Sequence, residues 1–270
     1  EACKTAYNAL GGRNGTVGVY NYKTGEILCL VSSPGFDPAN PPQISDDDTS
    51  GIYINKFFSS TIVPGSIFNL VTTAAAIDNL GDIDNFSYQC TGSKEINGEK
   101  ITCPSVHGKV DFYGALAQSC NCAYATLTLQ VGSEVMEDYV KKLGLTKSYD
   151  VNGIETAKGS FTFPKEARLN LGWAGIGQYE DQINPCSMMA YMGAIASGGK
   201  AASPVILKSL FPYKKETDQM LSSDTAGELQ KMMKNNVKSN YGEGNFPNLD
   251  IYAKLGTAEV GGYKAPNAWF

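Results

Sequence analysis

Two short runs near the start of the chain, residues 16–22 and 26–31, are alternating or apolar in pattern. Residues 23–25, Lys-Thr-Gly, join them with a turn sequence, so the two runs predict a β-hairpin near the start of a sheet. The next segment, residues 33–44, is rich in Pro and Gly and predicts a loop.

An almost uncharged run over residues 66–80 predicts a helix that is buried on most of its sides. Pro64 stands before this run and Gly81 follows it, which is the asymmetry that helix ends favour. We therefore expect this helix at the centre of the core.

Further apolar patterns predict helices in the middle and later parts of the chain. Residues 110–129 predict a second apolar helix pair or one broken helix. Ser133 is expected to cap an amphipathic helix that stops at Gly144. Residues 187–196, small and Met-rich, and residues 224–237, with an exposed charged face, predict two more helices.

Residues 251–260 predict a strand that ends at Gly261-Gly262, and residues 268–270 begin another. Strands at both ends of the chain with helices between them indicate the α/β class. We expect an antiparallel sheet built from N- and C-terminal strands and flanked by helices, with a helical lobe on the other side of a cleft. Residues 1–270 are interpreted as one domain.

The composition excludes some functions. A chain of 270 residues with 42% hydrophobic residues can bury a sizeable core. Its net charge of -5 comes from dispersed acidic residues, and no basic stripe is present. Nucleic acid is therefore not expected as a partner.

The chain begins at Glu1, contains no apolar run of about 18 residues, and stops at Phe270 in what reads as an unfinished strand. We interpret it as a fragment that lacks an N-terminal anchor and the remaining C-terminal strands. A membrane anchor outside the fragment is possible.

Cys90 and Cys103 flank the turn sequence Asn97-Gly98, which would bring their sulfurs together, so a disulfide between them is a hypothesis. Cys120 and Cys122 form a C-x-C pair, but the chain contains 1 His in all, which makes a poor metal site. We expect small packing residues there, and neither a metal nor a cofactor.

Ser66, at the start of a buried helix, has two interpretations. It could simply cap the helix, or it could be a nucleophile that the helix dipole assists. Asn69 lies one turn later, where a base should stand, and an asparagine amide cannot accept the hydroxyl proton.

Two weaker fragments lie downstream. Ser119-x-Asn121 could be polar capping at a helix boundary. In Lys254-Leu255-Gly256-Thr257, the lysine and the glycine share one side of a strand, and a glycine there permits a ligand backbone to approach closely. A lysine on an exposed strand is usually only solvated.

Together the three fragments resemble the transpeptidase domain of penicillin-binding proteins, whose motifs are S-x-x-K, S-D-N and K-T-G. Here they read S-x-x-N, S-x-N and K-L-G. The resemblance extends over most of the chain and also rests on these segments: residues 22–28, 31–38, 63–68, 107–121, 175–178, 254–259 and 268–270.

The resemblance implies catalytic roles for three residues. Ser66 would be the acylated nucleophile, and Ser119 with Lys254 would form a proton relay. No metal and no cofactor belong to this chemistry.

Substrate-binding roles are also implied by the resemblance. Asn121 would contact the ligand amide, and Gly256 with Thr257 would receive the backbone and the carboxylate of the substrate. Asn69 and Leu255 depart from the family pattern, since the first replaces the general-base lysine and the second a small hydroxyl residue.

The implied activity is serine acyl transfer on D-Ala-D-Ala stem peptides of peptidoglycan, or on β-lactams, at the extracytoplasmic face of the bacterial cell membrane. A general base contributes about 10²- to 10⁴-fold, so its loss raises the barrier by roughly 3 to 5 kcal/mol. We expect an impaired enzyme unless another base substitutes.

Alternative functions follow from the same residues. The chain could be a non-catalytic module that binds peptidoglycan or β-lactams. It could also hydrolyse β-lactams with Glu166, which begins an E-x-x-L-N segment similar to the loop of class A β-lactamases. A Ser-His-Asp triad built on His107 is less favoured than either.

Overall fold

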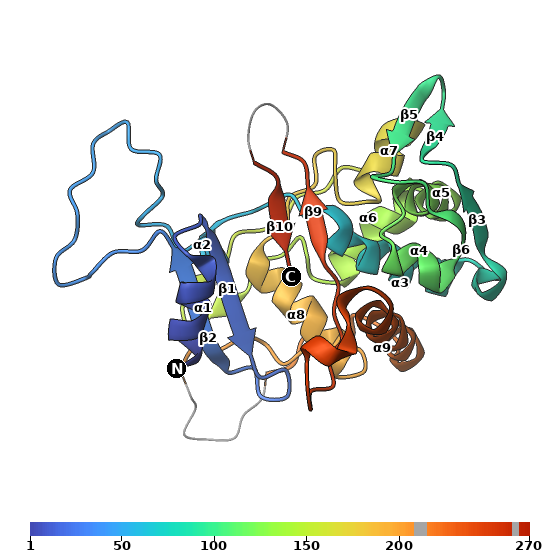
Figure 1. Cartoon of the computed structure of the whole chain (residues 1–270). Helices are drawn as coiled ribbons and strands as arrows, with labels where there is room; N and C mark the ends of the chain where they lie inside the picture. The colour runs from blue at the N-terminus through green and yellow to red at the C-terminus, as the bar shows by residue number, and fades with distance from the viewer. Residues whose placement is uncertain (208–214, 261–264) are drawn as a thin grey trace.

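The computed structural model describes residues 1–207, 215–260 and 265–270. Figure 1 shows helices packed together, with short strand pairs around them. The α-helices are α1 (Ala2–Leu10), α2 (Lys56–Ser59), α3 (Asn69–Asn79), α4 (Phe112–Ala117), α5 (Asn121–Val131), α6 (Ser133–Lys142), α7 (Arg168–Ala174), α8 (Pro185–Ala196) and α9 (Ser223–Asn236). Short 3₁₀ segments are η1 (Gly65–Phe68), η2 (Ile83–Asn85) and η4 (Glu243–Asn245), and η3 (Val237–Tyr241) is a π-helix.

The strands of the described residues pair two by two, and every pair is antiparallel. The pairs are β1 (Gly15–Tyr20) with β2 (Ile27–Ser33), β3 (Ser87–Cys90) with β6 (Gly108–Asp111), β4 (Ser93–Ile96) with β5 (Glu99–Thr102), β7 (Asp150–Val151) with β8 (Ile154–Glu155), and β9 (Gly256–Ala258) with β10 (Asn267–Trp269). The predicted α/β class and the N-terminal hairpin are confirmed. Within the described residues, however, the N- and C-terminal strands form separate pairs instead of one hydrogen-bonded sheet.

The C-terminal strand is shorter than predicted because side chains hold the backbone before it. The Asn236 amide donates to the Ala253 carbonyl at 3.1 Å, and the Leu255 N–H donates to the Tyr241 hydroxyl at 3.1 Å. Backbone groups satisfied in this way do not need a partner strand. The glycine pair 261–262, where the strand was expected to end, lies outside the described residues.

The predicted helix over residues 66–80 is present as η1 followed by α3. The predicted broken helix is α4 and α5, and Ser119 lies in the break with a φ of 49°. Ser133 does not cap α6, so that prediction was wrong. Its hydroxyl donates instead to the Phe163 carbonyl, a tertiary contact that the local pattern could not reveal.

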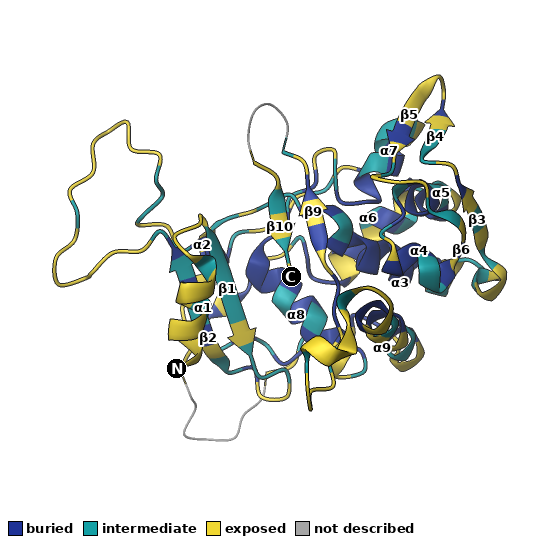
Figure 2. Ribbon diagram, in the orientation of Figure 1, coloured by how far each residue is buried: buried dark blue, intermediate teal, exposed yellow. Residues whose placement is uncertain are grey.

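Helix α3 lies at the centre of the core, packed against α5, α6 and α9. Figure 2 shows the surrounding helices as buried on their inward faces, whereas α1 and the long loop after β2 are exposed. Buried hydroxyls join α3 to its neighbours, because Thr73 and Tyr124 share a hydrogen bond of 2.8 Å and Tyr191 donates to the Leu70 carbonyl at 3.0 Å. The start of α3 is therefore held rigidly.

The turn Asn97-Gly98 closes the hairpin β4–β5, as predicted, with both residues at positive φ. The disulfide that this turn suggested is not formed. The Cys90 and Cys103 sulfurs lie 3.7 Å apart, well beyond the S–S bond length of about 2.05 Å. Within the part of the chain that the structure describes, no helix is long and apolar enough to cross a membrane.

Candidate active site

Ser66 is positioned by a close contact between three backbone segments. Gly65 has a φ of 56°, and its N–H donates to the Gly177 carbonyl at 2.8 Å. A Cβ atom on Gly65 would lie 2.4 Å from the carbonyl oxygen of Thr257 in β9. Only glycine permits both this conformation and this approach. We call the contact of residues 65, 177 and 257 the glycine joint.

Strand β9 lies against η1 and presents alternate residues to solvent. Lys254, Gly256 and Ala258 share one side, as the sequence predicted, and that side is buried, whereas the residues between them are exposed. A Cβ on Gly256 would lie 2.8 Å from the Ile67 nitrogen. This glycine is therefore required by the packing of the strand onto η1.

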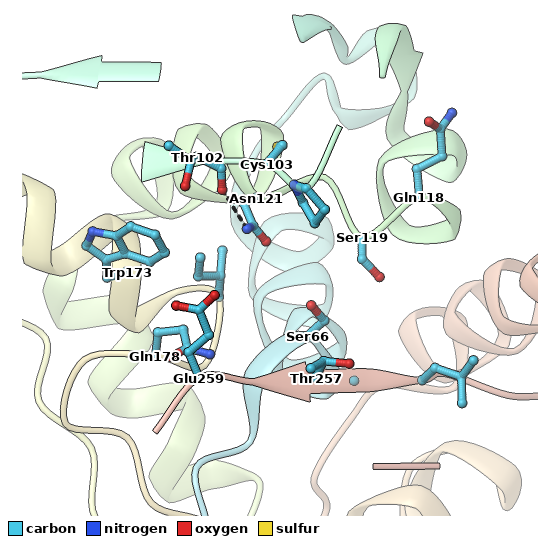
Figure 3. Close-up of a pocket in the computed structure, with 14 residues that line it drawn as sticks. Ser66, Thr102, Cys103, Gln118, Ser119, Asn121, Trp173, Gln178, Thr257 and Glu259 are labelled. Carbon is cyan, nitrogen blue, oxygen red and sulfur yellow. Dashed lines mark hydrogen bonds between the residues drawn. The ribbon is translucent and has the colours of Figure 1, made fainter. Parts of the chain in front are cut away.

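A cavity of about 400 Å³ lies between β9, the loop after α4, and the loop after β5. Figure 3 shows Ser66 and Thr257 on one side of it and Ser119 and Asn121 on the other. The lining residues come from every predicted motif: Ser66, Thr102, Cys103, Pro104, Gln118, Ser119, Asn121, Trp173, Ile176, Gln178, Leu255, Gly256, Thr257 and Glu259. The structure thus brings Ser66, Ser119, Asn121, Leu255, Gly256 and Thr257 together.

Lys254 lies beneath the cavity wall and is only 4% exposed, so it is not the solvated surface lysine of the simpler interpretation. Its ammonium nitrogen donates to the Ser119 hydroxyl at 2.5 Å and to the Leu255 carbonyl at 2.6 Å. Burial lowers the pKa of Lys254 to about 7, because the charged form loses its hydration. A neutral amine is therefore accessible near neutral pH.

Ser119 and Asn121 do not cap a helix. Ser119 is the acceptor of the Lys254 contact, and the Asn121 amide donates to the Thr102 carbonyl at 2.8 Å. The positive φ of Ser119 directs its hydroxyl into the cavity (Figure 3). Both side chains contact residues of other elements, which suits a site built between elements.

Ser66 does not cap a helix either. Pro64 precedes η1 and Phe68 precedes α3, and neither start has a side-chain cap. No described residue makes a hydrogen bond with the Ser66 hydroxyl. The hydroxyl faces the cavity with neither a structural partner nor a base bound to it.

Asn69 is fully buried and does not line the cavity. Neither its amide nitrogen nor its amide oxygen has a hydrogen-bond partner among the described residues. An unsatisfied buried polar group costs about 1–3 kcal/mol. The Asn69 side chain therefore contributes no hydrogen bond to this turn.

The residues of the alternative mechanisms lie elsewhere. Glu166 is exposed, precedes α7 and is not among the residues that line the cavity. His107 also lies outside the cavity lining, with its Nδ1 atom 3.5 Å from the Cys90 sulfur. Neither residue is placed to take a proton from Ser66.

Several lining residues, among them Gln178 and Trp173, received no individual role from the sequence. With its amide turned so that both groups are satisfied, Gln178 donates to the Glu259 carbonyl at 3.0 Å and accepts from the Glu259 N–H at 3.2 Å. This contact fastens the end of β9 to the loop after α7. The only signal in the sequence was the likeness of the segments at 175–178 and 254–259 to family motifs. Trp173, which also lines the cavity, gave no signal.

The fold is that of a known class of proteins. A family model of the penicillin binding protein transpeptidase domain matches residues 15–270. The chain belongs to this family.

Individual relatives are distant. The chain is 25% identical over 296 residues to peptidoglycan D,D-transpeptidase PbpA of Mycobacterium tuberculosis, a match that covers 95% of this chain and 58% of the relative. It is 26% identical over 255 residues to stage V sporulation protein D of Bacillus subtilis, covering 88% of this chain and 39% of the relative. The chain thus spans only part of these proteins.

Solved structures agree on the fold. The imipenem acyl-enzyme complex of penicillin-binding protein A from M. tuberculosis superposes with a TM-score of 0.82 at 25% identity, covering 95% of this chain and 64% of that chain. A D,D-transpeptidase domain from Eggerthella lenta superposes with a TM-score of 0.81 at 23% identity, and the match covers 96% of this chain and 70% of that chain.

Proposed function

We propose that this domain binds D-Ala-D-Ala stem peptides and β-lactams and is acylated by them at Ser66, slowly, with Lys254 and Ser119 in place of the missing base. The contact of 2.5 Å between the Lys254 nitrogen and the Ser119 hydroxyl, at the wall of the cavity that Ser66 faces, carries this proposal. It is supported by the pKa of Lys254 near 7, because a lysine with an ordinary pKa would remain charged.

In this proposal the side chains alone carry out the acylation step, without a metal or cofactor. The Ser66 oxygen attacks the substrate carbonyl carbon while its proton passes to Ser119, and the Ser119 proton passes to the neutral Lys254 amine. The C–N bond then breaks, and the proton returns through Ser119 to the departing nitrogen. D-Ala leaves from a peptide, whereas the opened ring of a β-lactam stays attached to the ester.

The substrate lies along β9 in this proposal. The exposed face of the strand offers Thr257 as a hydroxyl donor, and Asn121 on the opposite wall offers its amide. Leu255 is 40% exposed and lines the cavity where the family pattern has a small hydroxyl residue, so it weakens the hold on a carboxylate. We place this activity on the outer face of the bacterial membrane, where peptidoglycan is built.

A second candidate function is binding without turnover. The buried amide of Asn69 and the absence of a described hydrogen-bond partner for the Ser66 hydroxyl favour it. In that case the cavity would hold the same ligands, but no ester would form.

Labelled penicillin and intact-mass analysis test both functions. We expect one slow, persistent adduct on the parent protein, none on Ser66→Ala, and an unchanged adduct on the control Ser239→Ala, which alters an exposed serine on η3. Binding without any adduct would support the non-catalytic module. An adduct that is released within minutes would overturn the proposal in favour of hydrolysis.

A further inference from the structure

Four side chains that could ligate a metal meet beside the active site. Cys90 ends β3, Cys103 follows β5, His107 precedes β6, and Cys120 lies between α4 and α5. Their sulfur and ring nitrogen atoms all lie within 4.8 Å of one another. Cys90 and Cys120 are buried, and the other two are partly buried.

The spacing of these atoms matches a tetrahedral zinc site. Zn–S bonds of about 2.3 Å and Zn–N bonds of about 2.0 Å place two sulfurs about 3.8 Å apart and a sulfur and a nitrogen about 3.5 Å apart. The Cys90 and Cys103 sulfurs are 3.7 Å apart, and those of Cys103 and Cys120 are 3.8 Å apart. The Cys90 sulfur lies 3.5 Å from the His107 Nδ1 atom.

A disulfide fits these distances less well, because the sulfur–sulfur separations of 3.7, 3.8 and 3.4 Å are far beyond a covalent S–S length of about 2.05 Å. The Cys103 sulfur lies 3.8 Å from that of Cys120 and 3.4 Å from that of Cys122, as well as near that of Cys90, so it belongs to a cluster of sulfurs and not to one bonded pair. A nearby backbone group supports the same ligand, since the Cys122 N–H donates to the Cys103 sulfur at 3.4 Å. Such hydrogen bonds orient metal-bound thiolates.

We propose that Cys90, Cys103, His107 and Cys120 bind one structural Zn²⁺ ion. Four protein ligands close the coordination sphere, and three thiolates with one imidazole are a donor set that zinc prefers. The sequence led us to expect no metal, because the pair Cys120 and Cys122 was considered alone. The other donors come from strands that only the fold brings near.

The ion would fasten one wall of the cavity. Cys120 directly follows Ser119 and precedes Asn121, and Cys103 itself lines the cavity. Zinc bound here would tie the ends of β3 and β5 to the start of α5, and so hold Ser119 and Asn121 in place. It would take no part in the acyl transfer.

Metal analysis of the purified chain tests the proposal independently of acylation. After reduction, dialysis against zinc chloride and desalting, we expect about one zinc ion per chain in the parent protein. Cys103→Ser and His107→Asn should bind zinc about tenfold more weakly or worse. The matched control is Cys186→Ser, which alters a buried cysteine of α8 outside the cluster and should retain the ion.

Two measurements on the parent protein guard against variants that fail to fold. Removal of the metal with a chelator should lower the melting temperature, and Co²⁺ should bind with the near-ultraviolet absorption of cobalt thiolates. A parent protein without bound zinc would overturn the proposal. So would equal loss of zinc from Cys186→Ser, or a mass lighter by two hydrogen atoms that shows a disulfide within the cluster.

Discussion

Two buried asparagines begin helices in this domain, and their surroundings differ completely. Asn184 caps α8, where its amide oxygen accepts from the backbone nitrogens of Cys186 at 3.0 Å and Ser187 at 3.3 Å. Its amide nitrogen donates to the Ser60 carbonyl at 2.8 Å, among others. Asn69 begins α3 and has no described partner for either amide atom. Asn184 stabilises the fold through these hydrogen bonds, whereas Asn69 stands where the sequence motif predicts the family's base.

The difference teaches that burial alone does not tell which polar residue holds the structure. Each hydrogen bond of Asn184 satisfies a backbone group that would otherwise be stranded. Asn69 satisfies none, so the fold has no local need for an asparagine at that position. Changes at the two sites should therefore have different readouts, stability at one and chemistry at the other.

The largest expected effect is at the asparagine that builds the fold. Asn184→Ala should lower the free energy of unfolding by about 3 kcal/mol, because a helix cap is lost and several buried backbone groups lose their partner. Urea unfolding followed by circular dichroism measures this loss. Asn85→Ala, at an exposed asparagine, is the control and should change stability by less than about 0.5 kcal/mol. If Asn184→Ala lowers the free energy of unfolding by less than about 1 kcal/mol, the proposed difference between Asn184 and Asn69 is contradicted.

The next effect concerns the base that could replace the family's lysine. Burial lowers the pKa of Lys254 to about 7, so its neutral form dominates above that pH and disappears below it. Acylation by labelled penicillin should therefore slow about tenfold for each pH unit below 7 and level off above it.

Two lysine variants control the pH experiment. Lys254→Arg introduces a side chain that stays charged and should abolish the plateau. Lys56 is a buried lysine that does not line the cavity and donates to the Gly51 carbonyl at 3.2 Å. Lys56→Arg should therefore leave the pH profile unchanged. An acylation rate that does not vary between pH 5 and pH 8 would show that Lys254 is not the base.

A base restored beside the nucleophile should speed acylation. Asn69→Lys is expected to raise the rate of Ser66 acylation at least about tenfold, within the range of general-base catalysis. Asn69→Met fills the same space without basicity and should not raise it. If a folded Asn69→Lys protein acylates no faster than the parent, the cleft has diverged more deeply and binding without turnover becomes the better description.

The smallest effect should be the change in stability when Asn69, whose amide has no described partner, is replaced by an apolar residue. Asn69→Leu should leave the free energy of unfolding unchanged or raise it by up to about 1 kcal/mol, because it removes an unsatisfied group of similar size. Asn184→Leu, measured in the same urea experiment, should instead destabilise the protein. Similar losses at both positions would show that the Asn69 amide has partners in solution.

Local patterns predicted the elements that obey local rules. The helix at 66–80 and the broken helix at 110–129 were predicted because buried helices are poor in charged residues and helix ends favour particular residue types. The cap at Ser133 was wrong because the Phe163 carbonyl, distant in sequence, takes its hydroxyl. The strand at 251–260 was too long because Asn236 and Tyr241 hold its first half.

The site was predicted as a set of motifs and not as a geometry. The order of Ser66, Ser119 and Lys254 indicated a shared cleft. The burial of Lys254 to 4% exposure could not be predicted, because it depends on how the strand packs. The cysteine cluster was missed for the same reason, since Cys90 and Cys120 are neighbours only after folding.

The glycine joint has a consequence for how this domain can change. Backbone atoms of residues 65, 177 and 257 touch with no side chain between them, so the alignment of Ser66 with β9 does not depend on what stands at position 69. Asn69 does not line the cavity, so a substitution at position 69 should leave the outline of the cleft unchanged. The shape of the cleft and the chemistry of the residues near Ser66 can therefore vary independently in this scaffold.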